Sequence, residues 1–435
     1  MANYAPITQE YIDGIRPDVL DFICALYGYR CLSDELAYRF FCKHFWDKDF
    51  FLNLLNRLEK EDILQRINFF HDGENASALF LTERGIALIK EAQPEMCDTI
   101  RKKAHSLMLL PSKIHHQLSL NTFALQLKRE ASYNRFDFEY TDRLFFGKFG
   151  QHIYPDAVIM LNGQPVFVEA DCGTECYAAL LKKMQAYYQF LFSMNREFYF
   201  KTIKVVFVLD GVVTGDRRRQ TITKAFLDSG CCWLQSQIDV WVGTTDELCS
   251  ALCYGCIGTV KERIALDKAV DALEKHFRWR AERNAPLYPE PDPDDFEDPD
   301  LPGYIKKPLF VDAKFSFPIQ DGPYAGKSKT MYVDYFSKLH PSVLSPLITE
   351  FFSKQFASIY IVIFASERDA RNALKIIREH VNPSMPKFYC TTAERLSSRN
   401  FYEALFTVDE RDRLLHYTNE YLTEVEFERK ITKNG

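Results

Sequence analysis

A hairpin followed by a helix constrains this chain more than any other stretch of its sequence. After Pro155-Asp156 the residues are apolar and β-prone as far as Asn162-Gly163, a strong signal for a tight hairpin turn. The second strand of the hairpin is expected over Val166–Asp171. Because side chains alternate between the two faces of a strand, we expect Glu169 and Asp171 to point the same way, beside Asp156.

Three carboxylates at one end of a hairpin repel one another, and a hard divalent cation relieves that repulsion. We therefore expect Asp156, Glu169 and Asp171 to bind Mg²⁺, or Mn²⁺ in its place. The alternative is a helix-capping turn with solvated acids at two strand ends. The metal site is favoured because the Pro-Asp, the hairpin and a lysine-bearing helix occur in register.

The helix after the hairpin is expected to supply a positive charge. Thr174 would cap it, with Glu175 in the first turn, and apolar residues then recur at the spacing of one buried face. At about 100° per residue, Lys182 points away from that face, whereas Lys183 lies on its flank. Lys183 is therefore the predicted catalytic lysine, with Asp156, Glu169 and Asp171 as the catalytic acids.

This arrangement resembles the PD-(D/E)XK nuclease fold, with Pro155-Asp156 as the first half-motif and Glu169-Ala170-Asp171 as the second. The usual pattern has a lysine at the position of Asp171, so the lysine would have moved to the helix. The wider sequence is similar to the replication-relaxation family of plasmid and mobile-element proteins, over roughly residues 15–248. Its signs are a His-x-Leu-x-x-x-Asn-like segment at His115–Asn121, then Pro-Asp-Ala-Val, Glu-x-Asp-x-Gly-Thr-Glu and Lys-Met-x-x-Tyr.

The resemblance implies a DNA-binding protein that nicks or relaxes DNA by metal-dependent phosphodiester hydrolysis, in support of plasmid replication or transfer. Its partner would be double-stranded DNA. Two alternatives stay open: a catalytically inactive DNA-binding regulator of replication or transcription, and a protein-interaction module that recruits a relaxase or replisome partner. The sequence therefore leaves enzymatic activity undecided, and a homodimer is compatible with it.

Residues 15–92 predict a winged helix, with three helices, two strands around a polar loop at 71–77, and a last helix opened by Thr82–Gly85. Asp47 would cap the third helix, which would bury Phe50 and Phe51 with three leucines. This helix would enter the major groove of DNA, although its acidic residues leave a protein-contact role open. The expected DNA contacts on its exposed face are Lys48, Asn53, Asn56, Arg57 and Lys60.

The rest of the chain predicts an α/β fold. Helices are expected over 99–134, a strand over Phe136–Phe146, and an apolar strand over Ile203–Leu209. Arg217, Arg218 and Arg219 begin the next helix and are either phosphate contacts or a solvated face. The predicted domains are a winged helix (1–98), a PD-(D/E)XK nuclease-like mixed sheet flanked by helices (99–283, ending in a helix over 265–283), an acidic Pro-rich linker (284–308) and a degenerate nuclease-like αβ domain (309–435).

The degenerate domain is predicted because the last third of the sequence repeats the pattern of the middle. Counting from the pairing of Glu169 with Asp334, Asp171 falls on Phe336 and Lys183 on Ile348, so the second copy lacks the metal-binding chemistry. A helix is expected at 346–356. The matching stretches are Phe310–Ala313 with Tyr154–Ala157, Tyr332–Asp334 with Phe167–Glu169, 359–364 with 203–208, and 388–396 with 240–248.

Charge and cysteine content bound the remaining choices. The net charge of −6 argues against simple nucleic-acid binding, but seven acids lie within Pro289–Asp300, and the rest of the chain is close to neutral. The 12 cysteines have apolar neighbours and no export signal is visible, so we expect free thiols in the cytoplasm. Cys249, Cys253 and Cys256 have helical spacing, which favours core packing over zinc. No apolar run has the length of a membrane span.

Overall fold

The structure is a computed structural model of the 435-residue chain. It describes residues 7–8, 10–11, 14–42, 47–71, 74–94, 100, 102–146, 153–193, 203–209, 215–231, 238–254, 260–286, 310–318, 328–336, 341, 359–377, 388–399, 401–408 and 414–416. The architecture is mixed α/β, as the sequence predicted. The chain divides into two compact units, the first made of Met1–Phe149 with Tyr154–Cys172, the second of Gly150–Ile153 with Gly173–Gly435.

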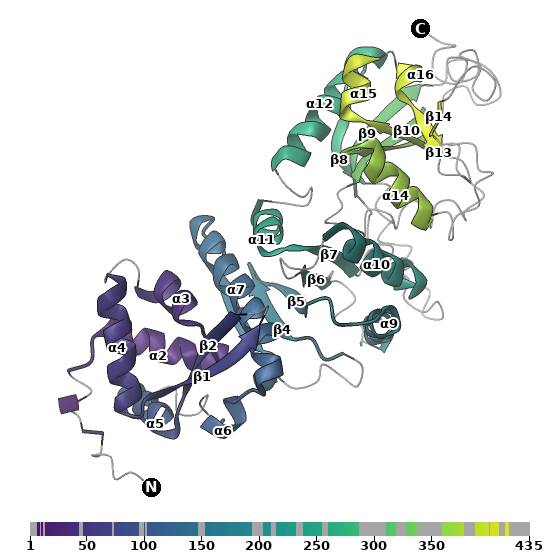
Figure 1. Cartoon of the computed structure of the whole chain (residues 1–435). Helices are drawn as coiled ribbons and strands as arrows, with labels where there is room; N and C mark the ends of the chain where they lie inside the picture. Colours follow the sequence, from purple (N-terminus) through teal and green to yellow (C-terminus); the bar gives the residue numbers. More distant parts are fainter. Residues whose placement is uncertain are drawn as a thin grey trace, which may run out of the picture. The chain divides into compact units, whose positions relative to one another are not determined.

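The first unit begins with the elements expected of the winged-helix region. Ser33, Asp47 and Thr82 accept hydrogen bonds from backbone N–H groups at three helix starts, which confirms the predicted cap at Asp47 and the predicted helix start at Thr82. The two strands form an antiparallel hairpin beside α4 and α5 (Figure 1). The elements are α2 (Pro17–Tyr29), α3 (Asp34–Ala37), the π-helix η1 (Tyr38–Cys42), α4 (Lys48–Lys60), β1 (Leu64–His71), β2 (Glu74–Leu81) and α5 (Glu83–Ala92).

Two details of this region differ from the prediction. Strand β2 begins at Glu74, so most of the expected polar loop at 71–77 is paired in the hairpin. Phe50, expected in the core, is 50% exposed, because the buried face of α4 is formed by Phe51 and three leucines. At the start of α5, a Cβ on Gly85 would overlap the carbonyl oxygen of Ile63, so this close backbone approach requires glycine.

The predicted hairpin of the candidate site lies in the same unit. Asn162 and Gly163 have φ of 48° and 73°, the left-handed pair that a tight two-residue turn needs. Strand β4 pairs with its neighbours on both sides in antiparallel register, and α7 packs against all three strands. The first strand is shorter than predicted, because the chain turns into a helix after Asp142. The elements are α6 (Ala104–Leu107), α7 (Pro111–Tyr133), β3 (Phe138–Asp142), α8 (Arg143–Phe146), β4 (Ala157–Leu161) and β5 (Gln164–Asp171).

The second unit begins with the expected lysine-bearing helix. This helix, α9, starts at Tyr177, so the predicted cap at Thr174 is wrong: Thr174 and Glu175 lie in the connection before it. Strands β6 and β7 pair in parallel. The elements are α9 (Tyr177–Ser193), β6 (Ile203–Leu209), α10 (Gly215–Asp228), β7 (Ile238–Thr244) and α11 (Thr245–Tyr254).

The C-terminal part forms a sheet of seven strands in the order β14-β13-β12-β11-β10-β9-β8. Leucine, alanine and valine side chains of α12 pack in the core of this sheet, although the helix was expected within the 99–283 domain. Residues 284–286, the first of the predicted linker, belong to β8. Residues 287–309 and the expected helix at 346–356 lie outside the described residues. The elements are α12 (Val260–Phe277), β8 (Glu282–Pro286), β9 (Phe310–Pro318), β10 (Ser328–Phe336), β11 (Ile359–Phe364), α14 (Glu367–Ile377), β12 (Phe388–Thr392), α15 (Ala393–Ser398), α16 (Phe401–Ala404), β13 (Phe406–Val408) and β14 (Leu414–His416).

The repeat seen in the sequence is also present in the strand registers. Ala157 pairs with Val168 across β4 and β5, and the matching Ala313 pairs with the matching Val333 across β9 and β10. In the parallel strands the match is offset by one residue: Phe364 pairs with Thr392, whereas Val208, which matches Phe364, pairs with Gly243. The antiparallel pairs β4–β5 and β9–β10 therefore share one register, and a second copy of the whole fold stays a prediction.

The turn after α7 has the same backbone conformation as the turn after α12. Arg135 after α7 and Arg278 after α12 both have a φ of 58°, and an aromatic residue follows each of them.

Among the helices that the structure describes, none has the length and apolar composition needed to cross a membrane.

Candidate functional site

Asp156 is tied to the end of the neighbouring strand β5. Its backbone N–H donates to the carbonyl oxygen of Val168, and its Oδ2 accepts from the N–H of Ala170, both at 3.0 Å. The carboxylate thus extends the β4–β5 ladder by one step. Because Ala170 lies between Glu169 and Asp171, the structure brings Asp156 to the strand end that carries both other predicted acids.

Two cationic side chains surround the Asp156 carboxylate, which is 13% exposed. His116 Nε2 lies 3.2 Å from its Oδ2, and an Arg143 guanidinium nitrogen lies 3.6 Å from its Oδ1. The Arg143 guanidinium also lies 3.6 Å from the centroid of the Tyr154 ring, which it covers. Neither His116 nor Arg143 was predicted as a site residue, although His116 lies in the His115–Asn121 segment that resembles the family.

His116 also contacts a cysteine at the end of β5. Its Nδ1 lies 3.9 Å from Cys172 Sγ. Burial by itself lowers the pKa of His116, but hydrogen bonds to Asp156 and Cys172 outweigh burial and raise the pKa to about 10. Burial raises the pKa of the Cys172 thiol, but its hydrogen bonds with His115 and His116 lower it overall. His116 is therefore a cation at neutral pH, and its charge offsets that of Asp156.

Glu169 and Asp171 are both buried, with 2% and 3% of their surface exposed. Carboxylate oxygens are the ligands that Mg²⁺ prefers, so the residue types fit the predicted ion. The side-chain positions fit it less well: over the described residues, no three or more Asp, Glu, His or Cys side chains are gathered around a point where an ion could bind. For Asp156 to bind a metal ion, its contacts with His116 and Arg143 would have to be replaced by contacts with the ion.

Lys183, the predicted lysine, lies in the second unit. Its Nζ contacts Glu175 Oε1 at 2.9 Å, and the backbone carbonyl of Glu175 accepts from the Arg218 guanidinium at 2.7 Å. Glu175 is the last acid of the Glu-x-Asp-x-Gly-Thr-Glu segment. It was expected in the first turn of the helix, but it precedes the helix and pairs with the lysine. A shared site of Lys183 with Asp156, Glu169 and Asp171 stays a prediction.

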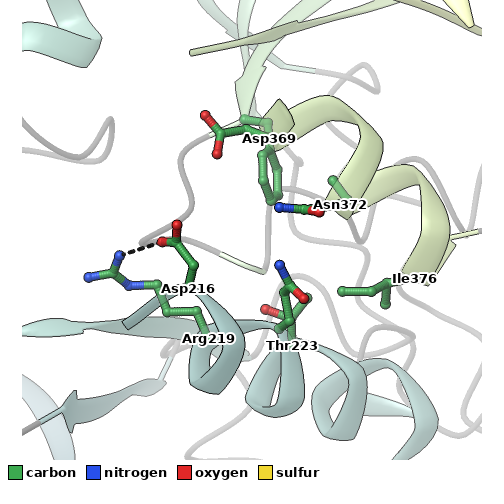
Figure 2. Close-up of a pocket in the computed structure, with 9 residues that line it drawn as sticks. Asp216, Arg219, Thr223, Asp369, Asn372 and Ile376 are labelled. Carbon is green, nitrogen blue, oxygen red and sulfur yellow. Dashed lines mark hydrogen bonds and ion pairs between the residues drawn. The ribbon is translucent and has the colours of Figure 1, made fainter. Parts of the chain in front are cut away.

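The three consecutive arginines of α10 have different environments. Arg217 is exposed, Arg218 binds the Glu175 carbonyl, and Arg219 is 7% exposed and paired with Glu247 and Asp216. A structural role therefore explains Arg219. It borders a cavity of about 40 Å³ between α10 and α14 (Figure 2), which has room for no more than a few water molecules.

The predicted DNA-binding face of α4 is solvent-exposed. Asn53, Asn56, Arg57 and Lys60 are all exposed, as is Lys48 at the start of the helix. Two of its cations are paired with acids: Lys48 with Glu35 at 2.9 Å and Arg57 with Glu61 at 3.7 Å. This face is therefore accessible but largely neutral, and its contact with DNA stays a prediction.

A buried polar network joins the winged-helix region to α7 and β3. The Asn121 amide donates to the carbonyl oxygens of Tyr29 and Cys31, at 2.9 and 2.6 Å. Gln117 donates to Asn121 and Asp142, and Arg30 lies 3.5 Å from Asp142, which is fully buried. The Asn of the family-like segment therefore has a structural role, and the predicted domain boundary at residue 98 falls inside the first unit.

The family model described as replication-relaxation matches residues 25–204. Over this range the chain is similar to the replication-relaxation family. This range contains α4, His116, the hairpin with its acids, and Lys183, so the resemblance predicted from the sequence is confirmed there. Similarity to this family suggests a role in the replication or transfer of a plasmid or other mobile element. No curated protein and no solved structure matched the chain.

Proposed function

We propose that this chain is a DNA-processing protein of a plasmid or other mobile element and that its nuclease-like core hydrolyses phosphodiesters. Asp156, Glu169 and Asp171 would hold Mg²⁺ or Mn²⁺, which supplies an activated water and neutralises phosphate charge. The observation that carries this proposal is the 3.0 Å hydrogen bond from the Ala170 N–H to Asp156, which places one carboxylate at the strand end bearing the other two.

The chain's own residues have distinct tasks in this proposal. Lys183, held by Glu175, offers a positive charge for the negative charge that develops on a phosphate under attack. Before a metal ion binds, His116 and Arg143 hold the Asp156 carboxylate in one orientation, and they would release it to the ion. The exposed polar face of α4 would position the DNA duplex.

A second candidate function is a DNA-binding factor that does not cut. The ion pairs of Asp156 favour this function, because His116 and Arg143 balance the charge of the Asp156 carboxylate without a metal ion. Recruitment of a relaxase or replication protein is a related alternative. The pairing of Lys48 with Glu35 and of Arg57 with Glu61 favours it, since a neutral face attracts phosphate weakly.

One assay separates these functions. Supercoiled plasmid is incubated with the protein in Mg²⁺, Mn²⁺ or EDTA, and binding is measured across a salt series. Metal-dependent nicking supports the nuclease. Salt-dependent binding without nicking in any condition supports the non-cutting factor, and the absence of salt-dependent DNA affinity supports the protein-recruiting module.

A further inference from the structure

A groove of about 760 Å³ lies in the first unit. It is formed by α2, the π-helix η1, the second half of α7 and strand β3. Its volume falls within the range of ligand sites, roughly 300–1,000 Å³. Neither Asp156 nor any predicted DNA contact of α4 lines it, so it constitutes a separate surface.

The groove is positively charged although the whole chain is negative. Its lining includes the cations Arg39, Lys128 and Arg129 and one acid, Asp21. The acid Glu130 lies 3.7 Å from Arg129 and offsets part of that charge. Because the chain carries a net charge of −6, this concentration of cations at one concave surface favours an anionic ligand.

Aromatic rings lie among these cations. The guanidinium groups of Arg39 and Arg129 lie 5.3 and 5.6 Å from the centroid of the Phe40 ring. Arg39 and Phe40 belong to η1, and a π-helical turn is a rare element that frequently occurs at functional sites. Tyr133, two turns of α7 after Leu125 and one after Arg129, is 74% exposed on the same stripe of the helix.

We propose that this groove binds single-stranded nucleic acid, with a base stacked on Tyr133 and phosphates paired with Lys128, Arg129 and Arg39. Single-strand sites combine a cationic groove with aromatic rings on which bases stack. A duplex hides its base faces, so it cannot use Tyr133 in this way. An acidic protein partner fits less well, because lysine is depleted at protein interfaces. A free nucleotide shares the chemistry but needs no open groove.

The test is fluorescence anisotropy with labelled oligo(dT) of about 12 nucleotides, a length within the usual range of single-strand sites. Tyr133→Ala should weaken binding about 10-fold or more, whereas Tyr133→Phe, which keeps the ring, should bind like the wild type. Lys128→Ala and Arg129→Ala should each weaken binding and lower the slope of log affinity against log salt by about 0.7. Lys113→Ala is the matched control, because Lys113 is exposed on the same helix but does not line the groove.

Three results would overturn the proposal. The first is oligo(dT) binding that is absent, or equal in the wild type and the Tyr133→Ala and Lys128→Ala variants. The second is competition by an equal-length duplex as strong as that by unlabelled oligo(dT), with the same dependence on Tyr133. The third is equally strong competition by dTMP, which would assign the groove to a free nucleotide. Plasmid nicking is not part of this readout, so the groove and the nuclease proposal stand or fall separately.

Discussion

His116 Nε2 lies 3.2 Å from Asp156 Oδ2, and this contact joins two motifs that are distant in the sequence. His116 belongs to α7 and Asp156 precedes β4. Because α7 also packs on β5, one helix both covers the hairpin and supplies the cation that faces its first acid. The pair therefore links the packing of the fold to the electrostatics of the candidate site.

The raised pKa of His116 predicts how stability depends on pH. The folded state keeps its proton up to a pKa of about 10, against an ordinary value of 6.5. The pair's contribution to the free energy of unfolding is therefore complete below about pH 6.5 and is lost as pH rises through about 10. Urea unfolding across this range should show falling stability in the wild type and a flatter profile in His116→Gln.

The control for that experiment is His105→Gln, since the His105 side chain is 74% exposed. We expect its profile to follow the wild type. Equal pH slopes in the wild type and His116→Gln would show that the His116–Asp156 pair does not stabilise the fold.

Substitution by alanine should change the stability of the fold in opposite directions at Gly85 and Gly28. Gly85→Ala forces a Cβ against the Ile63 carbonyl and should cost about 1–3 kcal/mol of stability. Gly28→Ala adds a methyl group in open space within α2, so it should stabilise the fold by about 0.5–1 kcal/mol. Chemical denaturation of both variants checks this pair. A tolerated Gly85→Ala would contradict the close approach of α5 to Ile63.

The buried network around Asp142 predicts a large loss on truncation. Asp142→Ala leaves Arg30 and Gln117 without their shared acceptor and should cost about 3–5 kcal/mol. The exposed Asp137→Ala should stay within about 0.5 kcal/mol of the wild type. Urea midpoints measure both. Similar costs for the two variants would mean that the network does not hold the winged-helix region to α7.

The C-terminal sheet contains a carboxylate contact related to that of Asp156. Asp312 Oδ2 accepts from the Tyr335 N–H at 2.7 Å, as Asp156 Oδ2 accepts from the equivalent Ala170 N–H. Asp334, equivalent to Glu169, is buried and accepts from the Asp312 N–H at 2.8 Å. Burial, and then the charge of Asp312, raise the pKa of Asp334 well above 3.8.

This raised pKa gives a further prediction. The folded state holds the Asp334 proton to higher pH than the unfolded chain does, so stability falls as pH rises above about 3.8. Asp334→Asn keeps the acceptor and removes the charge, so it should flatten that fall in a pH series of unfolding curves. Asp271→Asn, at an exposed ion pair, should leave it in place. A profile of Asp334→Asn that matches the wild type would refute the assignment.

The parts of the fold that depend on local chemistry could be predicted from the sequence. The caps Ser33, Asp47 and Thr82 and the Asn162-Gly163 turn follow from residues that act on their own backbone. The start of α9 could not be predicted from local residues, because the Glu175 side chain pairs with Lys183 and is not part of the first helical turn. The packing of α12 depends on strands that come after it in the chain.

The environment of the site was harder to predict than its acids. A Pro-Asp followed by paired acids is a strong local pattern, but nothing local distinguishes His116 from its neighbour His115. Only the packing of α7 against β4 and β5 selects His116. Similarly, three consecutive arginines look equivalent in sequence, and the position of Glu247 decides that Arg219 is buried.

The most direct test of the central claim is cleavage of supercoiled plasmid by the wild type, Asp156→Asn and Glu139→Gln, the last being an exposed acid on β3. With Mg²⁺ or Mn²⁺ the wild type and Glu139→Gln should nick DNA and EDTA should stop them. Asp156→Asn should be slower by about 100-fold or more while still binding DNA. A wild type that never nicks, or an Asp156→Asn protein that nicks at the wild-type rate, would contradict the account.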